Sequence, residues 1–392
     1  MKEKNYREIV GILSLSLLIT ATMSISGCLP EMLEEFSDYS RSAVESLLSI
    51  PAFSMMLVIA ATPLLLRYLK ERHMIVAGLL ITGISGILPA FVGSYPVLLA
   101  SRIFMGAGIG LINTKAVSMI GERFSGNLRQ RLQGIRCSME TLGQACLTFI
   151  AGQLLVLGWR YTFLIYGLAF VILLLYLAFV PDAKPAQADD PQAPAGRRRL
   201  TKEEWKFLFP NILLGTFVVS AITAISLRLP NHVVASSLGS SVEGSTVLSI
   251  SVLAGFAGGL FFGKLLQKLK TILLPLSMGL VTVGLITIAL ANSLMIAMLG
   301  AVLCGCFSTI TVSSTFNRLS DHLPVETLDK ANSMLLMGCN LGGFMTPYLL
   351  QAVGLINPQL SAGFLAYALL YGILSIGFFL NLARPSLKKR SC

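Results

Sequence analysis

Charged residues are scarce in this sequence. Only 12% of its 392 residues are Asp, Glu, Lys or Arg, whereas soluble proteins carry about 25%. Apolar residues make up 54% of the chain, and the mean hydropathy is +0.76. This composition excludes an ordinary soluble domain and indicates a protein of the membrane.

The chain also has few residues suited to catalysis or metal binding. Its three histidines, His73, His232 and His322, lie near predicted loops and far apart in sequence. It has no His-Glu-x-x-His pair, no Walker element and no Gly-x-Ser-x-Gly elbow. Cys304 and Cys306 lack the second pair of ligands that zinc requires. We therefore expect no enzyme activity, metal or cofactor. A receptor would be expected to carry a soluble signalling domain, and the sequence shows none.

Long apolar runs, in contrast, fill most of the chain. A helix needs about 20 mostly apolar residues to cross roughly 30 Å of hydrocarbon. Twelve stretches meet this requirement, so the sequence predicts an all-α membrane protein with 12 transmembrane helices. The predicted spans are residues 9–29, 47–68, 74–93, 96–120, 133–157, 160–180, 207–229, 247–266, 271–291, 294–316, 331–351 and 361–382.

Basic residues between the spans alternate from side to side. With the N-terminus in the cytoplasm, 25 of the 30 Lys and Arg lie in cytoplasmic segments, and only Arg41, Arg160 and Arg228 lie outside. The positive-inside rule predicts a multi-pass protein of the plasma (inner) membrane with both termini cytoplasmic. The net charge of +11 reflects this topology, and such scattered cations predict no nucleic-acid partner.

The N-terminus offers one alternative interpretation. The basic segment 2–7 precedes an apolar run that ends in Ile25-Ser26-Gly27-Cys28, in the form of a cleaved secretory signal. Cleavage would leave eleven spans and spoil the alternation of charge. We therefore favour an uncleaved first span.

A polar segment divides the chain in two. Residues 181–196 are rich in Pro, Ala, Gln and Asp, which predicts a flexible linker, and residues 197–206 predict a short basic amphipathic helix. The expected domains are a six-helix bundle over 1–180, a cytoplasmic linker over 181–206 and a second six-helix bundle over 207–392. Gly106 and Gly143 match Gly305 and Gly342 at an offset of 199 residues, as in two parallel repeats around a central cavity.

Two motifs carry a resemblance to a known family. Arg102, Gly106, Gly108 and Gly110 have the spacing Arg-x-x-x-Gly-x-Gly-x-Gly, and residues 158–163 read Gly-Trp-Arg-Tyr-Thr-Phe. On these residues the chain resembles the major facilitator superfamily over essentially its whole length. The resemblance implies a secondary transporter, with features of drug–proton antiporters.

The chain departs from the family's pattern at two places. The loop after the second span has the basic residues of the signature Gly-x-x-x-Asp-Arg-x-Gly-Arg-Arg, at 67–72, but neither its Asp nor its Gly. Span 133–157 keeps Gly134 and Gly143 of the antiporter motif but has Leu147-Thr148 in place of Gly-Pro. The subfamily and the direction of transport therefore stay open.

Arg102 is the first candidate functional residue. A charge inside a span costs several kcal/mol unless it faces a wet cavity or a partner. Counting 100° per residue places Asn113 about 20° from Arg102 on the same face, so Arg102 and Asn113 are predicted to serve substrate binding or proton coupling. A structural Arg bonded to backbone carbonyls is the alternative. In the family the corresponding Arg influences protonation of a nearby acid, and the resemblance implies that role here.

Glu140 is the carboxylate that we place well inside a predicted span. Burial favours a protonated carboxyl and a nearby cation favours the ionised one, so Glu140 could exchange protons during transport. A pair between Arg136 and Glu140 that closes the cytoplasmic side is the alternative, and we favour it slightly. Glu31, Glu34, Glu35 and Asp38 are predicted to face solvent in the first outer loop.

Other residues are assigned to packing and gating. Small residues every four positions let helices approach closely, which predicts packing at Gly106, Gly110, Gly255, Gly259 and Gly263. The predicted cytoplasmic gate consists of Arg67, Lys70, Arg72, Arg136 and Lys264. In the family the first, fourth, seventh and tenth spans line the cavity, which here are 9–29, 96–120, 207–229 and 294–316. Their hydroxyl and amide side chains are Ser16, Thr20, Ser24, Asn113, Thr216, Ser220, Thr223, Ser308, Thr311 and Ser314.

The function that we predict is proton-coupled efflux of small amphipathic molecules by alternating access. A neutral or anionic substrate is favoured because Arg102 is the clear central charge. The alternative is an importer or exchanger of a small organic anion, sugar or other metabolite. The expected partners are a small-molecule substrate, protons and the lipid bilayer, and the expected state is a monomer.

Overall fold

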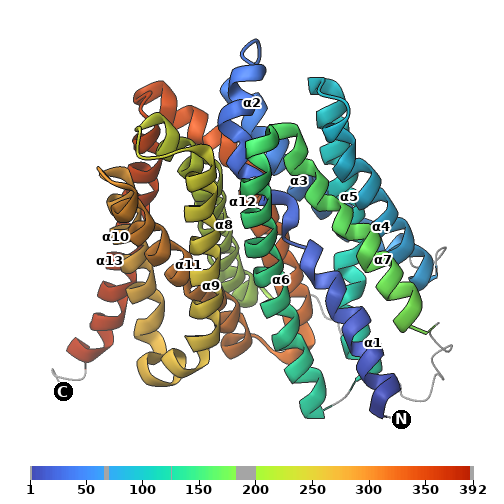
Figure 1. Ribbon diagram of the computed structural model, residues 1–392. Coiled ribbons are helices and arrows are strands. Elements are labelled where there is room, and N and C mark those ends of the chain that lie inside the picture. The colour runs from blue at the N-terminus through green and yellow to red at the C-terminus, as the bar shows by residue number, and fades with distance from the viewer. Residues whose placement is uncertain (1, 66–69, 125, 182–199, 389–392) are drawn as a thin grey trace. The chain divides into compact units, whose positions relative to one another are not determined.

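The computed structural model describes residues 2–65, 70–124, 126–181 and 200–388 (Figure 1). These residues form helices joined by short turns, with no strand among them, which confirms the all-α class. They gather into two compact units, one within Met1–Asp190 and Ser241–Ser249 and the other within Pro191–Ser240 and Ile250–Cys392. The α-helices are α1 (Lys2–Ser14), α2 (Leu29–Glu35), α3 (Arg41–Leu65), α4 (Glu71–Ile87), α5 (Tyr95–Arg123), α6 (Gly126–Leu154), α7 (Leu168–Phe179), α8 (Lys202–Ala235), α9 (Ser241–Leu269), α10 (Leu273–Ala289), α11 (Leu294–His322), α12 (Val325–Ile356) and α13 (Leu360–Lys388).

Most of these helices are long and apolar enough to cross a membrane. Within the described ranges nine stretches meet that criterion, or ten if a bent pair at the N-terminus is one span. One of the nine, Ser241–Ala289, contains both α9 and α10, and α12 covers the predicted span 331–351. Large apolar side chains such as Leu174, Leu260 and Leu369 are exposed, as on helices that face lipid. Twelve spans remain a prediction.

The first predicted span is not one continuous helix. After α1 the chain forms three 3₁₀ turns, η1 (Leu15–Leu18), η2 (Ala21–Met23) and η3 (Ser26–Cys28), before α2 begins at Leu29. The two arms, Tyr6–Leu18 and Ala21–Glu35, meet at an angle of 42°. Serine and threonine at residues 14–26 offer competing hydrogen bonds to the backbone, as where Ser26 Oγ donates to the Met23 carbonyl at 2.8 Å.

Helix α8 extends beyond the predicted span 207–229 at both ends. Thr201 caps it in a capping box, accepting from the Glu204 amide at 3.2 Å while Glu204 accepts from the Thr201 amide at 2.7 Å. Residues 202–206 therefore begin α8 rather than form a separate surface helix, and residues 197–199 lie outside the described residues. At the other end Arg228 and His232 are buried within α8, and His232 lies in its last turn, before the connection that begins at Ser236. The outer position of Arg228 stays a prediction.

Close helix contacts recur in both units at equivalent positions. A Cβ on Gly106 of α5 would collide with the backbone of Pro51 in α3, and one on Gly305 of α11 would collide with the backbone of Ser251 in α9. Likewise, Gly143 of α6 lies against the backbone of Leu17, and Gly342 of α12 lies against that of Thr216. Leu17 and Thr216 are 199 residues apart, as are Gly143 and Gly342, so each unit contains the same pair of helix contacts.

The remaining predicted packing glycines behave differently. Gly110 approaches Met55 and Val58 of α3, with its would-be Cβ 3.0 Å from Val58 Cβ, and Gly255 approaches Thr309 Oγ1 at 2.8 Å. Gly259 makes only ordinary contact, 3.7 Å from Thr309 Cγ2. For Gly263 the prediction finds no support, because no heavy atom among the described residues lies within 4 Å of a Cβ placed there.

Candidate functional site

Arg102 of α5 is enclosed by aromatic rings in the first unit. Its side chain is almost fully buried, and its guanidinium lies 4.5 Å from the Phe163 ring centroid and 5.0 Å from that of Tyr166. Both rings belong to the 3₁₀ helix η6 (Trp159–Gly167). Such cation–π contacts stabilise a guanidinium by roughly 2 kcal/mol when water is excluded. They hold Arg102 in place but do not replace hydrogen bonds to its N–H groups.

Only part of the hydrogen-bonding capacity of Arg102 is used. Nη1 donates to Tyr166 Oη at 3.2 Å and to Met105 Sδ at 3.1 Å. Nε and Nη2 are buried without a hydrogen-bond partner among the described residues. A buried cation with unsatisfied donors costs several kcal/mol, so Arg102 is poorly explained as a purely structural residue bonded to carbonyls.

Tyr166 links Arg102 to the broken first span. Its hydroxyl accepts from Arg102 and donates to the Ala21 carbonyl at 3.1 Å. Ala21 begins the 3₁₀ turn η2, and its carbonyl also accepts from the Ser24 amide at 3.0 Å. Sequence reasoning missed Tyr166, although the Trp159–Phe163 motif lies just before it and could have pointed to this segment.

Glu31 is less exposed than the sequence suggested. One of its carboxylate oxygens is buried and has no hydrogen-bond partner among the described residues. Glu31 lies in the first turn of α2, three residues after Cys28 at the end of η3. The prediction that Glu31 faces solvent is wrong for this oxygen, because α2 continues the first span through Glu35 instead of ending at residue 29.

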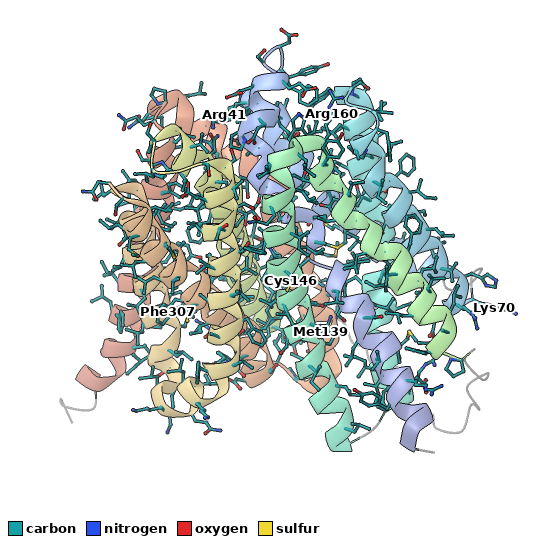
Figure 2. The ribbon with its side chains drawn as sticks, in the orientation of Figure 1. Arg41, Lys70, Met139, Cys146, Arg160 and Phe307 are labelled. Carbon is teal, nitrogen blue, oxygen red and sulfur yellow. The ribbon has the colours of Figure 1, made fainter. Side chains whose placement is uncertain are left out.

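The other acids of this segment, Glu34, Glu35 and Asp38, are exposed. Glu35 accepts hydrogen bonds from Trp159 Nε1 at 2.5 Å and from the guanidinium of Arg160. Figure 2 shows Arg41 and Arg160 near one end of this unit and Lys70 toward the other. The predicted topology assigns the same two ends to opposite sides of the membrane.

Glu140 of α6 forms the pair that its spacing predicts. Arg136 Nη1 donates to Glu140 Oε1, and both side chains are mostly buried. Thr20 Oγ1 donates to the backbone carbonyl of Glu140 at 2.8 Å, which places this turn of α6 beside the break in the first span. Arg102 is thus linked through Tyr166 to Ala21, and Glu140 is linked to the adjacent residue Thr20. No described contact joins the side chains of Arg102 and Glu140.

Asn113 does not join Arg102. Its Nδ2 lies 4.0 Å from Met55 Sδ of α3, whereas Arg102 contacts η6. The two residues are eleven positions apart on α5, and their side chains contact different neighbouring elements. Eleven residues span about 16 Å of helix, so different neighbours do not test a shared face, and that face stays a prediction.

A different set of charges joins the helix ends that we expect at the cytoplasm. Arg123, at the end of α5, donates to Glu8 Oε1 at 2.6 Å and to Glu71 Oε1 at 3.2 Å, and Lys115 Nζ lies 3.6 Å from Glu71 Oε2. Burial tends to lower the pKa of Arg123, but the bonds and charges of Glu8 and Glu71 outweigh it and raise that pKa. This network ties α1, α4 and α5 together.

The predicted gate residues contribute less to these described contacts. Lys70 and Lys264 are exposed, Arg72 is half-buried near the start of α4, and Arg67 lies outside the described residues. Arg136 pairs with Glu140 as described. Glu8, Glu71 and Arg123 are the residues that sequence reasoning missed, because their pairing joins segments up to 115 positions apart.

Several hydroxyls predicted to line a cavity instead form hydrogen bonds with other side chains of the second unit. Ser220 Oγ lies 2.5 Å from Tyr367 Oη and 3.0 Å from Thr346 Oγ1, and Thr311 donates to Ser277 at 2.9 Å. Ser308 Oγ, in contrast, is buried with no partner in the described part of the chain. Within the same ranges, no three His, Cys, Asp or Glu side chains gather as a metal site would need.

Comparison with known protein families identifies one family that matches this chain. The model of the Major Facilitator Superfamily matches residues 11–347 and, in an overlapping match, residues 212–391. No curated protein matches the chain by sequence.

Solved transporters have similar folds. A D-xylose–proton symporter has a TM-score of 0.76 at 16% identity, with 95% of this chain and 97% of that chain covered. A bacterial homolog of the human lysosomal transporter Spinster, in an inward-facing conformation, has 0.73 at 17%, with 98% of each chain covered. A peptide transporter POT in complex with alafosfalin has 0.74 at 14%, with 96% and 94% covered.

Proposed function

Because the chain belongs to the Major Facilitator Superfamily, we propose that it is a proton-coupled secondary transporter that exports small amphipathic molecules. Members of this family are transporters and not enzymes, and this chain has the family's helical fold. The proposed architecture is two six-helix bundles, which move relative to each other so that the site opens to each side of the membrane in turn. The protein is proposed to lie in the plasma membrane with both termini cytoplasmic. The matching glycine contacts in the two units support a repeated bundle.

The observation that carries the coupling proposal is a pair of charged residues whose hydrogen bonding is incomplete, Arg102 and Glu31. Arg102 has two buried nitrogen atoms and Glu31 has one buried oxygen without a hydrogen-bond partner among the described residues. Groups held in this way are costly and gain favourable contacts when a proton or a polar ligand group arrives. We propose that the carboxylate of Glu31 offsets the charge of Arg102 during the cycle, so that a proton on Glu31 changes which conformation is preferred.

The substrate class follows from the same residues. In this proposal Glu31 offsets the charge of Arg102, and the rings of Phe163 and Tyr166 lie against the guanidinium. A neutral amphipathic molecule suits such a site, because apolar walls with a few fixed polar groups bind ligands of that kind.

The alternative proposal is an importer or exchanger of a small organic anion, sugar or other metabolite. The sugar–proton symporter and the peptide transporter of similar fold keep this alternative open. At 14–17% identity such likeness concerns the fold alone.

The experiment that separates these proposals measures a panel of dyes and labelled metabolites in cells that make the protein, with and without an uncoupler. For export we expect lower accumulation of at least one compound, which the uncoupler reverses. Higher accumulation of a panel member would instead favour the importer, and no difference from cells lacking the protein would contradict both.

Substitution of the two acids distinguishes a proton site from a gate. We propose that Glu31 is the proton site and that Glu140, paired with Arg136, is the gate. Glu31→Gln should then retain substrate exchange between equal pools while losing its dependence on the pH gradient. Glu140→Gln should slow exchange as well as driven transport, because it breaks the pair that holds the closed form. The reverse pattern would assign the proton to Glu140.

A further inference from the structure

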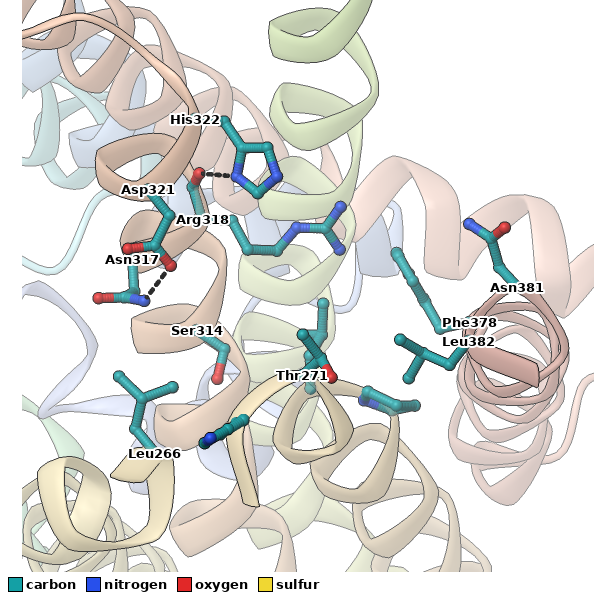
Figure 3. Close-up of a pocket in the computed structure, with 13 residues that line it drawn as sticks. Leu266, Thr271, Ser314, Asn317, Arg318, Asp321, His322, Phe378, Asn381 and Leu382 are labelled. Carbon is teal, nitrogen blue, oxygen red and sulfur yellow. Dashed lines mark hydrogen bonds between the residues drawn. The ribbon is translucent and has the colours of Figure 1, made fainter. Parts of the chain in front are cut away.

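A cavity of about 470 Å³ lies within the second unit, whereas Arg102 belongs to the first (Figure 3). It is bordered by the C-terminal end of α9 and η7 (Lys270–Ile272), the start of α10, the last turns of α11 and the C-terminal part of α13. By the charge pattern of the sequence, this end of the unit is on the cytoplasmic side. Its volume is in the range of sites that hold small ligands or parts of larger ones.

Arg318 of α11 offers a cation to this cavity. Its guanidinium lies 5.0 Å from the centroid of the Phe378 ring on α13, and the described structure gives it no ion pair or side-chain hydrogen bond. Ser314, one turn earlier on α11, also lines the cavity, and its buried hydroxyl has no partner among the described residues. A cation and a hydroxyl on one helix face can together bind an oxyanion, since each donates to an acceptor oxygen.

The balance of charge around the cavity is positive. Lys270 adds a second cation at the rim, and Asp321 is the opposing carboxylate. Asp321 already accepts from Asn317 Nδ2 at 2.9 Å, and both side chains lie together in Figure 3. His322 Nδ1 donates to the Arg318 carbonyl at 3.0 Å, and its ring stacks on Phe207. Two cations against one acid leave a net positive site without counting His322.

The walls of the cavity are apolar, and its edge adjoins the surface that we expect to face lipid. Leu266, Leu274 and Leu382 line it. On α13, next to the lining residue Asn381, Phe379 and Leu380 are 40% and 60% exposed. A ligand with an anionic head and an apolar tail would therefore place the head near Arg318 and Lys270 while its tail stays in the bilayer.

From this arrangement we infer that the cavity binds the phosphate of an acidic phospholipid from the cytoplasmic leaflet. Arg318 and Ser314 donate to the phosphate oxygens, Lys270 attracts the headgroup from the rim, and Phe378 keeps the Arg318 guanidinium in position. The residues of this site all belong to the second unit, and the inference does not depend on the transported substrate.

Native mass spectrometry of the full-length protein in detergent tests the inference, with phosphatidylglycerol and phosphatidylcholine as probes. The wild type should retain phosphatidylglycerol about tenfold more tightly, and Arg318→Gln should lose that preference, as expected for one charged hydrogen-bonding partner. Lys268→Gln is the matched control, because Lys268 is exposed near the end of α9 and does not line the cavity. It should retain the preference.

A second variant avoids the objection that Arg318→Gln disturbs the bundle. Asn381 is exposed on α13, so Asn381→Asp should fold while it adds a negative charge to the cavity, and it too should weaken phosphatidylglycerol binding. Equal binding of both lipids by the wild type, or full retention by both cavity variants, would overturn the inference. Displacement of the lipid by millimolar inorganic phosphate, which then binds with the same dependence on Arg318, would reassign the site to a soluble anion.

Discussion

Gly106→Ala and Gly305→Ala should each destabilise the folded protein by about 1–3 kcal/mol, the usual cost of overpacking a tight contact. The added Cβ would meet backbone atoms of Pro51 in the first case and of Ser251 in the second. Backbone atoms of a packed helix cannot turn aside as a flexible side chain can, so the helices must separate. The measurement is the thermal midpoint of monodisperse protein in detergent.

Gly263→Ala provides the control for this comparison. No described heavy atom lies within 4 Å of its would-be Cβ, so alanine should be neutral or should stabilise by up to about 1 kcal/mol through its helix propensity. If all three variants melt together with the wild type, the close helix contacts at Gly106 and Gly305 are not important for stability. A loss at Gly263 alone would contradict the assignment of packing roles.

Arg102→Gln should abolish gradient-driven transport while the protein remains folded in the membrane. Glutamine removes the positive charge that we pair with Glu31 in the coupling proposal, and its shorter side chain loses the hydrogen bond to Tyr166. The accumulation ratio of a transported panel compound should fall to that of uncoupled cells. A normal ratio in this variant would refute the role of Arg102 in coupling.

Two further variants separate charge from position at this site. Arg102→Lys keeps the charge but loses the planar group that stacks on Phe163 and Tyr166, so it should restore little of the driven transport. Tyr166→Phe keeps the ring and removes the hydroxyl that joins Arg102 to the Ala21 carbonyl. It should reduce driven transport less than Arg102→Gln, and size-exclusion profiles of all variants check that they fold.

Much of the general architecture could be predicted from the sequence. Apolar runs must cross a layer that offers no hydrogen bonds to the backbone, so length and composition predict helices reliably. The pair between Arg136 and Glu140 was also predictable, because four residues is one turn of a helix and both partners lie on the same element. The equivalence of Gly106 with Gly305 is visible in the sequence as a fixed offset.

The tertiary structure decided the surroundings of each charge. Arg102 was visible as a charge in a span, but its position against Phe163 and Tyr166 depends on how α5, η6 and the broken first span pack together. The first span continues past its bend into α2, so Glu31 lies on a helix with one buried oxygen rather than in the expected loop. Glu8, Glu71 and Arg123 meet across three helices, a contact that no local spacing encodes. The sequence by itself thus determined which segments are helical and which charges are costly, because these follow from local composition and solvent. Only the fold decided which partners those charges have, because partners are brought together by packing between distant segments.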